Sequence, residues 1–149
     1  MSEPINQNQD YRTVARQAAL QFLYQLEVQK GENLDQIETF LDEYCDSPQA
    51  RQRATELIKG TWVQVKTIDK LIASASTHWN LERINPVDLS NLRLGVYQLC
   101  YCPQIPPMAV INESVELAKQ FSTSQAYGFI NGILDTIRRN QQDEKVCHK

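Results

Sequence analysis

Apolar residues recur at helical spacing along most of this chain, and this periodicity constrains the fold more than any other feature. From Asp10 onward, apolar side chains three and four residues apart form stripes that stop at short polar or proline-containing breaks. Such stripes are typical of amphipathic helices packed around a core. The sequence has no segment with the alternating pattern of a half-buried strand. The pattern predicts an all-α fold of six or seven helices, in one compact bundle or two small subdomains.

Residues with capping chemistry indicate where helices begin. We expect Asp10 to cap a first helix that stops at Gly31, and Ser47 and Asn85 to cap two others, each followed by a proline in the first turn. The stretch 48–76 reads as one long helix or two stacked ones. Further helices are expected over about 33–44 and 107–120, and a last helix follows "STS". We expect residues 1–9 to be disordered, 10–139 to form the helical domain and 140–149 to be a frayed tail.

The last helix carries Gly128 and Gly132, although a glycine inside a helix costs about 1 kcal/mol relative to alanine. Both point away from its apolar stripe, which is formed by Ala126, Ile130, Ile133, Leu134 and Ile137. One interpretation, which we favour on the pattern, is a second packing surface that another helix approaches closely. The other is backbone left open for a partner or a nucleic acid, near the polar side chains of Asn131, Asp135 and Arg138.

The overall charge excludes binding to nucleic acid through bulk electrostatics. The net charge is −3 and the isoelectric point is about 5.4, so any nucleic-acid site must be local or shared with a partner. The start, "MSEPINQNQD", does not read as a signal peptide, and no apolar run approaches the roughly 20 residues that cross a bilayer. We therefore expect a cytoplasmic protein with reduced cysteines.

Patterns of catalytic or metal chemistry do not stand out in this sequence. There is no glycine-rich phosphate loop and no Ser-His-Asp arrangement. Cys100 and Cys102 lack a second pair at zinc-site spacing, and His78 and His148 are the only histidines. We expect no enzymatic activity, no metal and no cofactor.

Several segments resemble the NusB family of bacterial transcription antitermination factors. "ARQAALQFLYQLE" (15–27), "VDLSNLRLGVYQL" (87–99) and "IPPMAVINE" (105–113) are similar to the family's first helix, its central helix and the turn that follows. "ESVELAKQFSTSQAYGFINGILD" (113–135) is similar to its last motif. The match runs in order over roughly residues 12–138.

The resemblance implies an all-helical fold of two three-helix-like bundles and a binding function. Members bind the boxA element of nascent RNA, chiefly ribosomal RNA leaders, as a heterodimer with the ribosomal protein NusE. The complex joins other Nus factors on RNA polymerase and suppresses premature termination. Carried over to this chain, the RNA-binding residues are Arg12, Arg16, Tyr24, Phe121, Phe129 and Asn131. The residues expected at the NusE surface are Glu82, Arg83, Asn85 and Asp88.

These positions also have simpler interpretations. Arg12 and Arg16 share one flank of a helix, where their guanidinium groups can pair with phosphates or simply face solvent. Phe129 lies beside the core stripe of the last helix and suits stacking on a base better than Phe121, which can fill the core. A capping role at the start of a helix is enough to explain Asp88.

The chain departs from the family at its beginning, where members often carry a run of arginines. The segment "DYRTVAR" has only Arg12 and Arg16, and Asp10 adds a negative charge. Fewer basic residues neutralise fewer phosphates, so we expect the partner to supply much of the RNA affinity. Two alternatives stay open: a stand-alone domain related to the N-terminal part of ribosomal RNA cytosine methyltransferases, and a helical homodimer without an RNA role.

Overall fold

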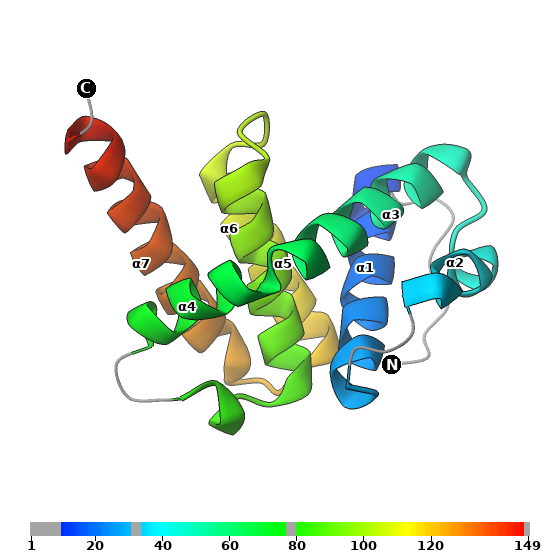
Figure 1. The fold of residues 1–149 in the computed structure, drawn as a ribbon, viewed down its shortest axis with the longest axis horizontal. Helices are drawn as coiled ribbons and strands as arrows, with labels where there is room; N and C mark the ends of the chain where they lie inside the picture. Colours follow the sequence, from blue (N-terminus) through cyan, green and yellow to red (C-terminus); the bar gives the residue numbers. More distant parts are fainter. Residues whose placement is uncertain (1–9, 31–33, 77–79, 148–149) are drawn as a thin grey trace.

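The computed structural model describes residues 10–30, 34–76 and 80–147, with side chains described up to 142. These residues form seven α-helices and two short 3-10 turns and include no strand, so the predicted all-α fold is confirmed (Figure 1). The helices are α1 (Tyr11–Val28), α2 (Ile37–Tyr44), α3 (Pro48–Val63), α4 (Val65–Ala75), α5 (Pro86–Tyr101), α6 (Pro107–Phe121) and α7 (Ala126–Cys147), and the turns are η1 (Leu34–Gln36) and η2 (Leu81–Arg83). Within these ranges, no helix is both long enough and apolar enough to cross a membrane.

Three helices begin at the residues that the sequence predicts. Oδ1 of Asp10 accepts a hydrogen bond from the N–H two residues later at 2.8 Å. Oγ of Ser47 and Oδ1 of Asn85 each accept from the N–H three residues later, at 3.3 and 2.9 Å. These bonds satisfy backbone donors that the first turn of a helix leaves free. The predicted stop at Gly31 lies outside the described residues.

The sequence pattern does not show two helix boundaries, the break between α3 and α4 and the end of α7. The stretch 48–76 forms two helices, because the chain turns at Gln64, whose N–H closes the last turn of α3 on the carbonyl of Gly60 at 3.2 Å. From Gln64, α4 leads away from α1 and packs on α5 and α7 (Figure 1). At the other end, α7 is helical to Cys147, past the position where we expect the tail to begin.

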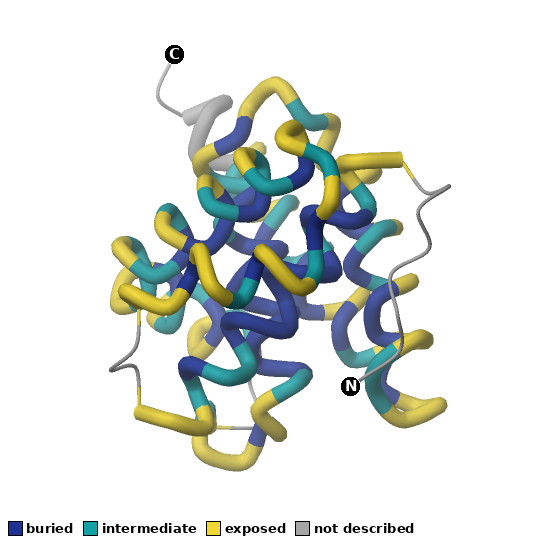
Figure 2. The backbone as a smooth tube through the Cα atoms, turned by 90° about the vertical axis from the view of Figure 1, so that its right-hand side faces the viewer, coloured by how far each residue is buried: buried dark blue, intermediate teal, exposed yellow. Residues whose placement is uncertain are grey.

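The core consists of two apolar clusters that meet at α5. The first is built mainly by α1, α2 and α3, with Leu117 of α6, and the second by α4, α5, α6 and α7. Leu94 of α5 belongs to the first cluster, Leu92 and Val96 belong to the second, and Tyr97 packs against both. The central helix α5 is therefore buried along most of its length, and Figure 2 shows that the buried backbone gathers in the middle of the molecule. The two expected subdomains correspond to these clusters, the second drawing on four helices.

Gly95 allows the helices of the second cluster to approach α5 closely. A Cβ at this position would lie 3.0 Å from both a methyl carbon of Leu134 on α7 and Oγ of Ser114 on α6. Any larger side chain would push these two helices outward, because protein interiors are close-packed. The position of α6 and α7 relative to α5 sets the surface on which the candidate site lies.

Candidate nucleic-acid interface

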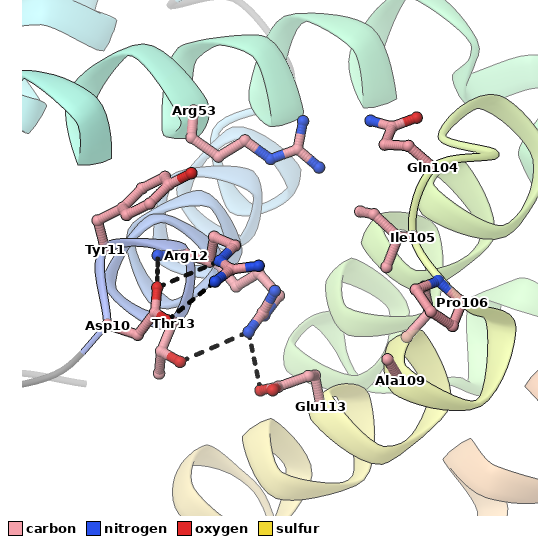
Figure 3. A pocket seen from close by; sticks show the side chains of 12 residues that line it. Asp10, Tyr11, Arg12, Thr13, Arg53, Gln104, Ile105, Pro106, Ala109 and Glu113 are labelled. Carbon is pink, nitrogen blue, oxygen red and sulfur yellow. Dashed lines mark hydrogen bonds and ion pairs between the residues drawn. The ribbon is translucent and has the colours of Figure 1, made fainter.

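A pocket of about 450 Å³ opens between the start of α1, the first half of α3 and the first turn of α6 (Figure 3). We call it the arginine pocket, because three arginines line it. The charged side chains in its wall are Asp10, Arg12, Arg16, Arg53 and Glu113. The volume lies within the range of about 300–1,000 Å³ that is usual for small-ligand sites.

Arg12 lies at the exposed edge of the arginine pocket. Its guanidinium contacts the carboxylate of Asp10, with both nitrogen–oxygen distances at 3.3 Å. The backbone N–H and then the side chain of Arg12 hold the pKa of the Asp10 carboxyl below its ordinary value. An exposed ion pair of this kind is weak, so Arg12 can exchange Asp10 for another anion.

Arg16 lies deeper, with 12% of its side chain exposed. It pairs with Glu113 of α6 at 3.0 Å and lies 3.5 Å from Oγ1 of Thr13. Burial lowers the pKa of Arg16, Glu113 opposes this effect, and the nearby positive charge of Arg53 adds to it. Nε of Arg16 is buried and has no hydrogen-bond partner. Nε of Arg16 is therefore closed off from the open space of the pocket, and the terminal nitrogens of this guanidinium make the contacts with Glu113 and Thr13.

Arg53 of α3 also lines the pocket, although the sequence does not predict it there. It faces α1 across the pocket, with its guanidinium turned toward the open space (Figure 3). The one signal in the sequence is its place beside Ala50 and Ala54, small residues that are buried where α3 packs on α1. A position next to such a close contact lies at the edge of the interface between α1 and α3.

A second pocket, of about 250 Å³, lies at the start of α5 and α7, and we call it the Phe129 pocket. Its wall includes Phe129 together with Arg83, Asn85, Asp88 and Gln125. The ring of Phe129 is half-buried against the second core cluster. The structure thus brings one residue predicted to bind RNA next to three predicted to bind the partner.

Asp88, one of the residues expected at the NusE surface, is buried at the start of α5. Only 6% of the surface of Asp88 is exposed. Its two carboxylate oxygens accept hydrogen bonds from the amide of Asn85 and the hydroxyl of Ser122, each at 2.7 Å. Asp88 therefore ties the start of α5 to the end of α6, and the exposed acid of this region is Glu82.

Gly128 and Gly132 lie on an open face of α7. A Cβ added at either position would meet no atom within 4 Å, so no other described helix packs on them. This corrects the interpretation that we favoured from the sequence. Asn131 is exposed on the same stretch, and Tyr127 lies beneath the ammonium group of Lys119 from α6, 5.3 Å from the ring centre. The α7 backbone here is accessible to a partner.

The structure separates the remaining predicted RNA-binding residues from both pockets. Tyr24 is half-buried in a third pocket, between α1 and α2, together with Gln21, Phe40 and Tyr44. Phe121 packs against the first core cluster, as its simpler interpretation has it. Neither residue lines the arginine pocket or the Phe129 pocket.

The part of the chain that the structure describes holds no cluster of three His, Cys, Asp or Glu residues suited to a metal ion. Cys45 and Cys102 are free thiols, and Sγ of Cys100 accepts a hydrogen bond from the amide of Gln141 at 2.9 Å. Burial raises the pKa of Cys45, which keeps this thiol protonated and unreactive. His78 and His148 lie outside the described residues.

Fold and pockets together define an all-helical domain with charged and aromatic pockets between its helices. The chain belongs to the NusB family, whose family model matches residues 13–139, and this confirms the resemblance found in the sequence. The transcription antitermination protein NusB of Syntrophus aciditrophicus is 38% identical over 138 residues, which cover 89% of this chain and 86% of the relative. That of Oleidesulfovibrio alaskensis is 39% identical over 137 residues, or 86% and 87% of the two chains.

Solved structures agree with this assignment. NusB of T. maritima matches with a TM-score of 0.77 and 33% identity, over 93% of both chains. A crystal structure of the antitermination factors NusB and NusE in complex with dsRNA matches with a TM-score of 0.79 and 26% identity, over 87% of this chain and 97% of the other. The relatives are named as transcription antitermination proteins, not as enzymes.

Proposed function

We propose that this chain is a transcription antitermination factor that binds the boxA RNA of ribosomal RNA leader transcripts together with NusE. In this proposal it acts in the cytoplasm, within an antitermination complex on RNA polymerase. The names of its relatives and the solved complex of NusB, NusE and dsRNA support the general role. The residues of the two pockets support the finer assignment.

The observation that carries the proposal is a row of polar side chains between α1 and α6, here called the polar seam, that extends from the arginine pocket to the last turn of α6, next to the Phe129 pocket. A shallow pocket next to the arginine pocket shares Thr13 and Glu113 with it and extends to Lys119. The amide groups of Gln17 and Gln120 bridge the two helices at 3.1 Å. Past the end of α6, Ser122 bonds to Asp88 in the wall of the Phe129 pocket. From the first turn of α6 to its end the seam is about 20 Å long, at 1.5 Å per helical residue.

The two ends of the seam offer different chemistry for a nucleic acid. Guanidinium groups bind phosphates through paired N–H donors, which supplies affinity without reading sequence. The half-buried ring of Phe129 offers a surface on which an unpaired base can stack, with polar groups of Arg83 and Asn85 beside it. A strand that follows the seam places its backbone on the arginines and an unstacked base at Phe129.

The partner surface begins at the Phe129 pocket. Glu82 and Arg83 are exposed beside it, and an exposed acid suits a basic ribosomal protein. Because the RNA and partner surfaces meet here, NusE can cover RNA that is bound at Phe129. Asp10 and Glu113 neutralise part of the charge of Arg12 and Arg16, which weakens the binding of RNA to the chain alone. We therefore expect the complex of the chain with NusE to bind RNA more tightly than the chain does.

Fluorescence anisotropy of labelled boxA RNA, with and without purified NusE and at two salt concentrations, tests the proposal. We expect tight binding that needs NusE and is lost with a scrambled RNA. A double-stranded competitor separates recognition of an unpaired sequence from recognition of a duplex. If no mixture distinguishes boxA from the scrambled RNA, the RNA role is rejected, and sedimentation then tests the homodimer alternative.

A further inference from the structure

We propose that Arg53 acts with Arg12 and Arg16 to hold one phosphate of the RNA backbone in the arginine pocket. The inference rests on the proposed RNA-binding function and adds to it a residue from a second helix. It assigns a specific ligand group, a phosphate, to a specific place in the fold. Arg53 lies far from the first two arginines in the sequence, so only the packing of α3 on α1 brings the three together.

The geometry suits a phosphate held from two sides. Arg12 and Arg16 line the pocket from α1, and Arg53 lines it from α3 with 19% of its side chain exposed. In Figure 3 the guanidinium of Arg53 reaches into the space between α1 and α6. A guanidinium presents its donors in a planar fork that matches two oxygens of a phosphate. Three guanidinium groups, two on α1 and one on α3, can bind one tetrahedral phosphate from different directions.

The charges of the pocket favour an anion at Arg53. Arg12 and Arg16 have acidic partners, Asp10 and Glu113, that also line the pocket. The acid near Arg53 is Glu56 on its own helix, at a longer distance of 3.6 Å, and Glu56 is not among the residues lining the pocket. The charge of Arg53 is therefore the least neutralised of the three within the pocket.

Two further features favour an anion between the arginines. The positive charge of Arg53 disfavours the charged form of Arg16, and an anion placed between the two groups would relieve this repulsion. The remaining wall includes Pro106, which precedes α6, and Ala109 in its first turn, and this end of the helix carries partial positive charge. These features support the site but do not define it without the arginines.

This third arginine offsets the departure of the sequence from its family. The first helix has two arginines where members often carry a run, and Asp10 neutralises part of their charge. Arg53 restores a positive charge from α3. The contribution of Arg53 should appear in the salt dependence of RNA binding, because each phosphate contact releases counterions.

The test compares Arg53→Gln with Arg51→Gln, a matched control on the same helix. Arg51 pairs with Asp42 at 2.8 Å and is not among the residues lining the arginine pocket, and both variants lose one positive charge. With NusE and boxA RNA, we expect Arg53→Gln to weaken binding and to reduce the magnitude of the slope of log K against log salt by up to about 0.7, the value for one phosphate of a single strand, since Arg12 and Arg16 still contact the same phosphate. Arg51→Gln should keep the slope of the wild type. Thermal unfolding of both variants checks that each is folded.

A second readout separates this inference from the proposed function. Titration with inorganic phosphate, followed by NMR of the arginine Nε–Hε groups, should shift the signals of Arg53 and Arg16 in the wild type. If the wild type binds no RNA but shows these shifts, the anion site stands and the RNA function is lost. If Arg53→Gln behaves like Arg51→Gln in the salt slope, and phosphate leaves the Arg53 signal unmoved, the inference is overturned.

Discussion

The guanidinium of Arg93 on α5 donates two hydrogen bonds to the carboxylate of Asp69 on α4, at 2.8 and 2.9 Å. It also pairs with Glu27 near the end of α1 and lies over the ring of Trp62 on α3. Its side chain is 8% exposed. Burial alone would lower the pKa of Arg93, but the hydrogen bonds to Asp69 and Glu27 outweigh burial and raise it. One buried cation thus joins helices of both core clusters.

Replacing Arg93 by methionine should destabilise the fold strongly. Two partly buried carboxylates would lose their cation, and breaking a buried pair in this way costs about 3 kcal/mol or more. Urea unfolding measures the loss. The control is Arg139→Met, because Arg139 forms an exposed pair with Asp135 at 3.2 Å, and such pairs contribute about 1 kcal/mol or less. Equal losses in the two variants would contradict the role of Arg93.

Gly60→Ala should also destabilise the fold, for a steric reason. A Cβ at Gly60 would lie 2.6 Å from Cε1 of Tyr97 and closer still to the end of that ring. Tyr97 is held between the two core clusters and stacks on Tyr101, so the ring has little freedom to move. Overpacking of this kind costs about 1–3 kcal/mol. The loss should shrink in a Tyr97→Leu background, and an undiminished loss there would show that this clash is not its cause.

Gly128→Ala and Gly132→Ala should stabilise the chain and weaken its complex. Both glycines lie in open space on a helix, so alanine should add about 0.5–1 kcal/mol at each position. If this face of α7 binds RNA or NusE, the new methyl groups should reduce complex formation in the anisotropy assay. Destabilised variants would reveal a close approach that the structure lacks. Stabilised variants with unchanged binding would exclude this face from the interface.

The capping carboxylate of Asp10 should make the first helix sensitive to acid. Its pKa is lowered below the ordinary value of 3.8 in the folded chain, mainly by the backbone N–H of Arg12. The stabilisation is therefore present above about pH 3.8 and disappears as the pH falls through the lower folded pKa. An NMR titration of the Asp10 carboxyl should show the lowered midpoint, and Arg12→Gln should raise it partway. A midpoint at or above 3.8 in the wild type would contradict the cap.

The sequence predicted the helices better than it predicted the site. The start signals at Ser47 and Asn85 are local, because the side chain bonds to a backbone group only three residues away. The apolar spacing continues through Gln64, so the pattern does not show whether one helix or two form there. Arg53 was missed because its role depends on which helices pack together. The open face at Gly128 was misread, because a periodic pattern shows which residues face the core but not what covers the opposite side.

Read-through of a terminator in a reconstituted transcription reaction tests the central claim most directly. The reaction contains bacterial RNA polymerase, NusE and the other Nus factors, with templates that carry or lack boxA upstream of the terminator. We predict that adding this chain raises read-through on the boxA template only, and that Phe129→Ala reduces the effect. Equal read-through on both templates, with and without the chain, would contradict the proposed function.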